Sequence, residues 1–161
     1  MHSGGEFAPS DVGASSRQSN GSHEDTKRSR FADLEALATA AIDCGFRLHA
    51  DLGPGLLESA YEALMAEGLR QRGLEVARQV AVPLQYNGVV VDNAFKVDLL
   101  VEGKLVLELK SIDRLAPVRG KQVLTYLRLM RLPLGLLMNF GQATFRDGLR
   151  RVANDYYATI E

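Results

Sequence analysis

Two stretches in the first half of the chain carry apolar residues at every third or fourth position, the spacing of a helix with one buried face. The first covers residues 31–52 and the second residues 56–73. Between them, Gly53 suits the end of one helix and Pro54 suits the first turn of the next. The pattern therefore predicts two consecutive helices.

After residue 74 the pattern changes to partial alternation with many β-branched residues, which favours strands. Three strands are predicted, over residues 75–86, 89–101 and 105–112. Asn87-Gly88 is a typical hairpin turn between the first two strands, and Glu102–Lys104 forms a second turn before the third. We expect three consecutive strands joined by tight turns.

The second predicted strand leaves room for a break at Asp92-Asn93. Further along the chain, Pro117 starts a predicted helix, and the apolar run Leu134–Phe140 is typical of a strand buried on both faces. Residues 145–152 form either a last strand or a helix. Two helices, three strands, a helix and a strand in this order predict an α/β fold.

The length of 161 residues suits one domain with a sizeable core. Residues 1–30 contain seven Ser and four Gly without the apolar segment of a secretory signal, so we expect a disordered leader before a single domain over residues 31–161. Cys44, the one cysteine, excludes an internal disulfide and favours a reducing, cytoplasmic setting; we expect it to be a small buried side chain. No apolar run is long enough to cross a membrane.

Charged residues interrupt the apolar pattern of the second and third predicted strands. Glu108 and Lys110 are two positions apart, so they share one face of their strand, while Leu107 and Leu109 share the other. Asp98 lies among aliphatic residues of the preceding strand. Because a buried unpaired charge is costly, these residues either lie on an exposed polar face or form a site.

The register of the hairpin decides between these possibilities. Asp98 lies opposite Glu108, on the same face of the sheet, only if Val101 pairs with Leu105. That register leaves a three-residue loop in which Gly103 can adopt a left-handed conformation. A two-residue loop would put Asp98 on the other face. A functional site therefore predicts the three-residue loop.

Two carboxylates with room for water suit Mg²⁺ or Mn²⁺, which prefer oxygen ligands. Such an ion lowers the pKa of bound water and stabilises charge that develops on a phosphate. Lys110 could orient or deprotonate the attacking water, or neutralise the phosphorane. Asp98, Glu108 and Lys110 thus indicate a phosphodiester hydrolase. His49 is expected to be a packed or surface side chain rather than a ligand.

Asp98 followed by Glu108-Leu109-Lys110, on a hairpin between helices, resembles the PD-(D/E)XK nuclease superfamily, whose core is α-β-β-β-α-β. The chain is also similar to the small bacterial GxxExxY (GxxExxxer) proteins, whose signature stands here as Gly55-Leu-Leu-Glu58-Ser-Ala-Tyr61. The resemblance extends from His49 to Val152. It implies a PD-(D/E)XK nuclease-like core preceded by an extra N-terminal helix.

The resemblance implies roles for the matching acidic and basic residues. Asp98 and Glu108 would hold the metal, Glu58 would join them from the second predicted helix, and Lys110 would be the catalytic lysine. Glu58 also lies in the first turn of its helix, where the helix dipole alone favours a carboxylate. Glu62, one turn further on, could be a second acid that supports the site, but we expect it to face solvent.

The resemblance also implies residues that contact the substrate. Gln122 and Tyr126, four positions apart on one helix face, match a motif that follows the catalytic lysine in part of the superfamily and would line the substrate groove. Arg119 stands where the family has a His; it can hold a phosphate but cannot act as a base at neutral pH. Arg119 and Lys121 would flank Gln122. Tyr61 and Tyr126 contact either the substrate or the core.

The net charge of −1 conceals an uneven distribution. Residues 110–151 contain nine Lys and Arg against two Asp. Neutralisation of phosphates provides most non-specific affinity for nucleic acids. Since no base-reading module is visible, we expect a nucleic-acid partner bound through its backbone with low sequence specificity.

Three functions remain open at this point. The first is a metal-dependent nuclease, and the second is a non-catalytic module that keeps the fold and binds nucleic acid or a protein. The third is a phosphoesterase that acts on nucleotides, which a deep pocket would favour over an open groove. The small size suggests that target choice comes from a partner protein or from a homodimer through residues 31–48.

Overall fold

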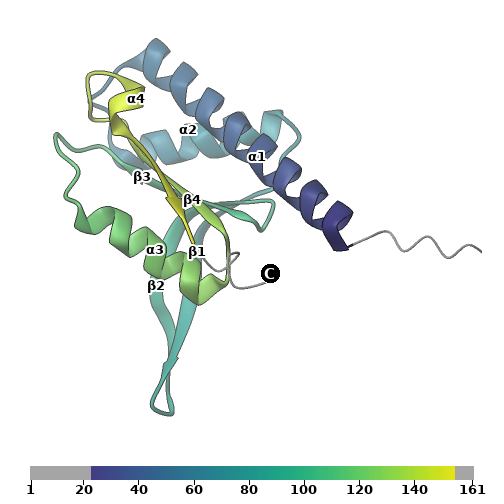
Figure 1. The fold of residues 1–161 in the computed structure, drawn as a ribbon. Helices are drawn as coiled ribbons and strands as arrows, with labels where there is room; N and C mark the ends of the chain where they lie inside the picture. The colour runs from purple at the N-terminus through teal and green to yellow at the C-terminus, as the bar shows by residue number, and fades with distance from the viewer. Residues whose placement is uncertain (1–22, 155–161) are drawn as a thin grey trace, which may run out of the picture.

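A computed structural model describes residues 23–154, with side-chain surroundings from residue 33 onward. Five strands form one sheet in the order β1-β2-β3-β4-β5, with α1 and α2 over one face and α3 over the other (Figure 1). The elements in chain order are α1 (His23–Leu52), α2 (Glu58–Gln71), β1 (Val76–Tyr86), β2 (Val89–Val101), β3 (Leu105–Lys110), α3 (Val118–Met130), β4 (Leu134–Asn139), α4 (Phe145–Gly148) and β5 (Leu149–Ala153). The predicted α/β fold class is confirmed.

The ends of the chain differ in detail from the expected elements. Helix α1 begins at His23, before the expected start near Phe31, and residues 1–22 of the predicted leader lie outside the described residues. Near the other end, residues 145–153 form both candidates in succession, the short helix α4 and then strand β5. The division into a leader and a single domain stays a prediction.

The β2–β3 turn has the predicted register. Val101 pairs with Leu105, which leaves three residues in the loop. Glu102 and Gly103 both adopt positive φ, at 53° and 63°. Glycine adopts this conformation without a steric penalty, so Gly103 helps to set the register that brings Asp98 and Glu108 to the same face.

Strands β3 and β4 lie in the centre of the sheet and pair in parallel. Almost every residue of both strands is buried. A parallel pair that is covered by helices on both faces requires such continuous apolar strands, as predicted for Leu134–Phe140. Glu108 is therefore a carboxylate in one of the most buried strands of the protein.

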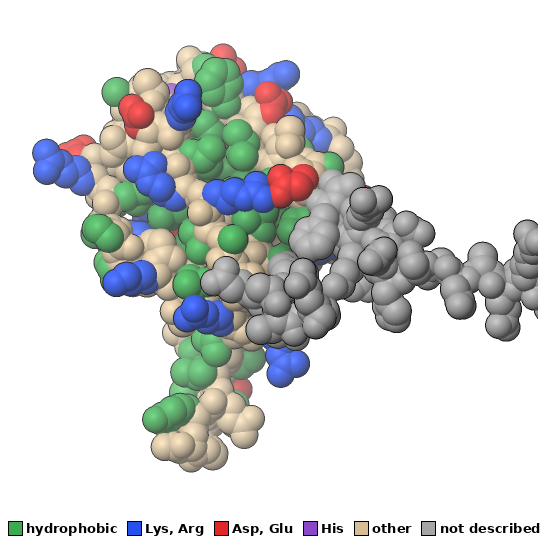
Figure 2. Space-filling view, viewed as in Figure 1, with side chains coloured by type: hydrophobic (Ala, Val, Ile, Leu, Met, Phe, Trp, Pro, Cys, Tyr) green, Lys and Arg blue, Asp and Glu red, His purple; other side chains and the backbone are tan. Residues whose placement is uncertain are grey.

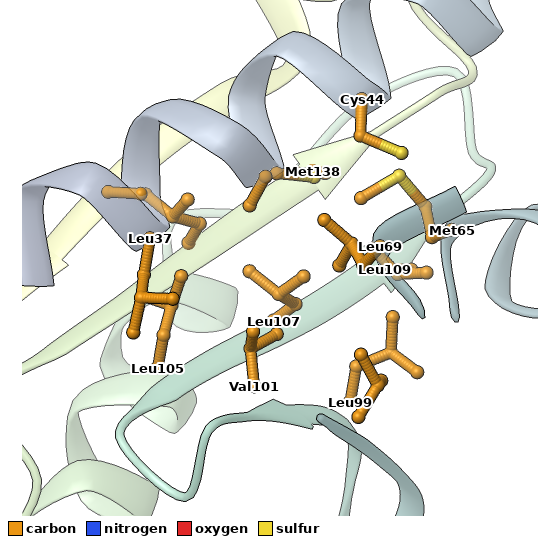
Figure 3. Packing of buried hydrophobic residues seen from close by; sticks show 14 of the residues in the cluster. Leu37, Cys44, Met65, Leu69, Leu99, Val101, Leu105, Leu107, Leu109 and Met138 are labelled. Carbon is orange, nitrogen blue, oxygen red and sulfur yellow. The ribbon is translucent and has the colours of Figure 1, made fainter. Parts of the chain in front are cut away.

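Two hydrophobic clusters hold the layers together. The larger lies between the sheet and helices α1 and α2. Figure 3 shows Leu37 and Cys44 of α1, Met65 and Leu69 of α2 and Leu107 of β3 in this cluster, with Cys44 pointing toward Met65. The smaller lies under α3 and contains Val82, Val97, Val106, Val123 and Leu127. The prediction that Cys44 is a small buried side chain is confirmed.

The distal part of the β1–β2 hairpin projects beyond the sheet (Figures 1 and 2). Its register shifts between Val82 and Leu84, opposite the predicted break at Asp92-Asn93. Tyr86 and Val89, at the tip, are exposed. None of the helices in the described part of the chain has the length and apolar character needed to span a membrane.

Candidate metal centre

Asp98 of β2 and Glu108 of β3 are brought together by the hairpin. Leu99 pairs with Leu107, so the two carboxylates occupy the next opposed positions and share a face. The backbone N–H of Leu109 donates to Oδ2 of Asp98 at 2.8 Å, and each carboxylate residue is only 8% exposed. Two acidic groups are thus buried side by side.

Lys110 lies between two acidic side chains. Its Nζ is 3.8 Å from Oε1 of Glu58 and 3.9 Å from Oε1 of Glu108. These distances correspond to ion pairs rather than short hydrogen bonds. Asp98, Glu108, Lys110 and Glu58 therefore form one cluster, here called the carboxylate–lysine cluster, although they are spread over residues 58–110.

The loop before α2 positions Glu58 in this cluster. Gly55 has a φ of 109°, which glycine adopts and other residues avoid. The Tyr61 hydroxyl donates to the carbonyl of Gly53 at 2.5 Å and accepts from the N–H of Leu56 at 3.3 Å. In the GxxExxY pattern, the Gly therefore allows the turn, the Glu supplies the charged group, and the Tyr stabilises the turn through its two hydrogen bonds.

Tyr61 does not lie where a substrate-contacting side chain would. It is fully buried and stacks on Phe140 with ring centroids 4.3 Å apart. The alternative of a core aromatic with a satisfied hydroxyl describes its position. Ser111, directly after Lys110, completes the connection by donating from Oγ to the carbonyl of Leu56 at 2.7 Å.

The electrostatics of the cluster centre on Glu108. Burial, and then the neighbouring Asp98 carboxylate, raise the pKa of Glu108 from its ordinary 4.5 to about 8. Burial also raises the pKa of Glu58, and the nearby charge of Lys110 opposes that shift. Oε2 of Glu108 is buried and has no hydrogen-bond partner. A buried oxygen without a partner is costly, so Glu108 has an acceptor for a positively charged group once its carboxyl loses the proton.

These residues fit a Mg²⁺ or Mn²⁺ ion. Mg²⁺ is usually bound by one or two carboxylates together with water and substrate phosphates. Asp98 and Glu108 supply the two carboxylates, and Lys110 lies between Glu108 and Glu58. Within residues 33–154, no group of three or more His, Cys, Asp or Glu side chains that could hold a metal occurs. An ion on these two carboxylates would keep positions for water and for phosphate oxygens.

Glu62 and Gln79 also adjoin the cluster, and Gln79 is not among the site residues predicted from the sequence. Glu62 is buried, so the prediction that it faces solvent was wrong. Its carboxylate accepts from Nε of Arg78 at 3.2 Å and from Nε2 of Gln79 at 2.8 Å, and the same Nε2 lies 3.2 Å from Oδ1 of Asp98. Helical spacing places Glu62 on the same face as the buried Met65 and Leu69, but periodicity contains no signal for its partners, because they belong to a distant strand.

Helix α3 contributes residues on the other side of the cluster. Burial, and then the charges of Glu108 and Asp98, raise the pKa of Tyr126. Arg119 donates to Oε1 of Gln122 at 3.3 Å, and both side chains are half-buried. Three of the predicted substrate residues on α3 therefore face the same region of the molecule.

Lys121 differs from its neighbours on α3. It is exposed, and adjacent residues of a helix point in different directions. Its predicted contact with substrate would therefore lie farther round the helix than that of Arg119 and Gln122. His49 is buried, and its Nε2 is 2.8 Å from the carbonyl oxygen of Gln142. It is a packed side chain, as expected.

The basic residues of the last third of the chain are distributed over the surface. Figure 2 shows Lys and Arg side chains separated by apolar and neutral ones. Arg151 is paired with Glu35 of α1, and Arg150 donates to the backbone carbonyl of Asp147. A hollow of about 420 Å³ between α1 and α4, lined by Ile42 and other mostly apolar residues, contains no residue of the carboxylate–lysine cluster.

A sequence model of the PD-(D/E)XK nuclease superfamily matches residues 35–152. The chain belongs to this superfamily. The match includes every residue of the carboxylate–lysine cluster and runs from α1 to β5. Searches of curated proteins and of solved structures found no match. Membership suggests nuclease-like activity, and PD-(D/E)XK nucleases typically use divalent metals.

Proposed function

We propose that this PD-(D/E)XK protein is a metal-dependent phosphodiesterase that cleaves nucleic acid, with Asp98, Glu108 and Lys110 as its catalytic residues. The observation that carries the proposal is the buried Oε2 of Glu108, which has no partner and lies beside a second buried carboxylate. A divalent cation would satisfy both groups, because nearby positive charge favours the ionised form of a carboxyl.

The proposed roles follow from the position of each group. Asp98 and Glu108 would hold Mg²⁺ or Mn²⁺, and Glu58 would join them at the ion. The ion, when bound, stabilises the charge that develops on the phosphate and lowers the pKa of water. Lys110 has three donor protons and lies within 4 Å of two carboxylates, so it is positioned to orient the attacking water or to neutralise the phosphate.

Substrate binding is assigned to the side of the cluster formed by α3. Arg119 presents a fork of N–H donors that suits a phosphate, and its bond to Gln122 sets the orientation of both groups. Tyr126 is held by stacking on Phe95, with ring centroids 4.0 Å apart. Contacts of this kind recognise the backbone of a nucleic acid rather than its sequence.

We also assign the chain to the GxxExxY proteins within the superfamily. The support is structural: Gly55 adopts a positive φ, Glu58 reaches Lys110, and Tyr61 closes the turn between them. Action in the cytoplasm, and a homodimer or partner protein that selects the target, remain parts of the proposal. Phe46 of α1 is exposed, which suits an interface on residues 31–48.

A cleavage assay tests the function. Single- and double-stranded DNA and RNA are incubated with Mg²⁺ or Mn²⁺ and with Asp98→Asn or Lys110→Met. Asp92→Asn, an exposed carboxylate of the same strand, and Lys104→Met, an exposed lysine of the β2–β3 loop, are the matched controls. We expect cleavage by the wild type and both controls, and a loss of at least about a hundredfold in both cluster variants, since each removes charge at the reacting phosphate.

Equal cleavage by the wild type and both cluster variants would exclude the site. If none of the nucleic acids is cleaved although they bind, the alternative of a non-catalytic binding module replaces the proposal. Cleavage confined to free nucleotides would instead identify a nucleotide phosphoesterase.

A further inference from the structure

Gln79 of β1 has an unusual backbone conformation for its position. Its φ is 50°, in the left-handed region that residues other than glycine seldom adopt. The other non-glycine residues with positive φ in the described chain are Asn87 and Glu102 in hairpin turns and Arg131 at the end of α3. Among the described residues, Gln79 is thus the one such residue inside a strand.

The hairpin changes direction at this point. On one side of Gln79 and Asp98, Val76 and Leu99 belong to the large cluster under α1 and α2. On the other side, Val82 and Val97 belong to the small cluster under α3. A local irregularity that turns the strands from one core to the other explains the backbone conformation, and glycine would adopt it with less strain.

The side chain of Gln79 makes contacts that glycine could not make. Its Nε2 donates to Oε2 of Glu62 at 2.8 Å and to Oδ1 of Asp98 at 3.2 Å. An amide nitrogen has two protons, so both donors of Gln79 are directed at carboxylates. The N–H of Leu109 holds the other oxygen of Asp98. Both oxygens of the Asp98 carboxylate are therefore fixed by donors from neighbouring strands.

Glu62 extends these contacts to α2. It lies one helical turn after Glu58 and is also bonded to Arg78, the residue before Gln79. A chain of hydrogen bonds therefore connects the helix that carries Glu58 to the strand that carries Asp98. The amide of Gln79 is the link between the two.

We propose that Gln79 is a positioning residue of the metal centre, which sets the orientation of the Asp98 carboxylate and its placement relative to α2. This inference rests on the proposed function, since it concerns how Asp98 meets the cation. Residues that orient metal ligands typically change metal affinity by about 10- to 100-fold when they are removed. Backbone strain at such a position is retained because the side chain is needed there.

The test is a calorimetric titration of the full chain with Mn²⁺, accompanied by thermal unfolding without metal. Gln79→Gly removes the amide and relaxes the backbone, and Gln79→Met keeps the length of the side chain without its donors. Gln85→Met, at an exposed position of the same strand, is the matched control. Asp98→Asn is included to show that the measured Mn²⁺ binds at the cluster.

We expect both Gln79 variants to bind Mn²⁺ about 10- to 100-fold more weakly than the wild type, and Gln85→Met to bind like the wild type. In Gln79→Gly the relaxed backbone offsets part of the stability lost with the two hydrogen bonds. The unfolding temperature without metal separates the two roles, because a purely structural role would lower affinity only in a variant that is itself destabilised. Weak binding by a variant of undiminished stability is the signature of positioning.

Two results would overturn the inference in distinguishable ways. If Mn²⁺ binding depends on Asp98 but is unchanged in both Gln79 variants, Gln79 does not position the site and the proposed function survives. If the wild type does not bind Mn²⁺, the proposed function and the role of Gln79 fail together. Affinity that is lost only in an unstable Gln79→Gly, and kept in Gln79→Met, would assign Gln79 to folding alone.

Discussion

Glu108→Gln is the substitution with the sharpest expected consequence, because it removes one ionisable group and keeps the shape of the side chain. In the folded protein the pKa of Glu108 is raised from 4.5 to about 8, first by burial and then by Asp98. Between these two pH values the folded protein keeps a proton that the unfolded chain releases. Raising the pH through this interval therefore favours unfolding.

The magnitude follows from the size of the interval. One pKa unit corresponds to about 1.4 kcal/mol, so the full shift corresponds to at most about 5 kcal/mol of unfolding free energy. Because glutamine does not titrate, Glu108→Gln should escape this loss. The difference in stability between the two proteins should be smallest near pH 5 and should grow in favour of the variant as the pH rises.

Urea unfolding with a chelator present measures this difference. Wild type, Glu108→Gln and the control Glu67→Gln, at an exposed carboxylate of α2, are compared at about pH 5, 7 and 9. We expect the advantage of Glu108→Gln to increase by a few kcal/mol across the series and Glu67→Gln to follow the wild type. A difference in unfolding free energy between Glu108→Gln and the wild type that does not change with pH would refute the raised pKa of Glu108.

Addition of Mn²⁺ should reverse the order of stability. A ligand that binds only the folded state stabilises it in proportion to the logarithm of its concentration over Kd. The wild type should gain stability with Mn²⁺, and Glu108→Gln should gain little, because an amide cannot supply the negative charge. A variant that is more stable without metal and does not respond to metal would show that Glu108 is retained for function.

Three further results are expected. Tyr61→Phe removes both hydrogen bonds of the turn before α2, so it should lower the free energy of unfolding by about 1–2 kcal/mol in urea titrations. Retention of full stability would show that these hydrogen bonds do not stabilise the turn. Gly55→Ala places a side chain at a φ of 109° and so displaces Glu58. The cleavage rate should therefore fall even though thermal unfolding shows a folded protein, and an unchanged cleavage rate would contradict this role of Gly55. Arg119→Ala should reduce the slope of log affinity for nucleic acid against log salt by about one, measured by fluorescence anisotropy, with Lys104→Ala unchanged.

The hairpin and its carboxylates could be predicted from the sequence because their determinants are local. Alternation sets which side chains share a face, and Gly103 in a three-residue loop sets the register; Val101 pairs with Leu105 as expected. Asp98 and Glu108 therefore lie opposite each other on neighbouring strands. Lys110 follows from the same alternation.

The remaining contacts of the site could not be predicted, for physical reasons. Glu62 shares the helical spacing of the buried Met65 and Leu69, but its charge favours an exposed position, and the Arg78 and Gln79 side chains that bond to it come from a distant strand. The backbone of Gln79 adopts a conformation that its residue type disfavours. An aromatic ring with a hydroxyl suits both the core and a substrate groove, so the sequence alone does not decide the position of Tyr61. Such outcomes depend on tertiary packing.

The central claim is that Asp98 and Glu108 together bind a divalent cation. Anomalous diffraction from a crystal soaked in Mn²⁺ tests it most directly, since the signal locates the ion without reference to activity. We expect a peak within about 2–2.5 Å of an oxygen of each carboxylate, and none in crystals of Glu108→Gln. A crystal with Mn²⁺ bound elsewhere, and none beside Asp98 and Glu108, would contradict the account.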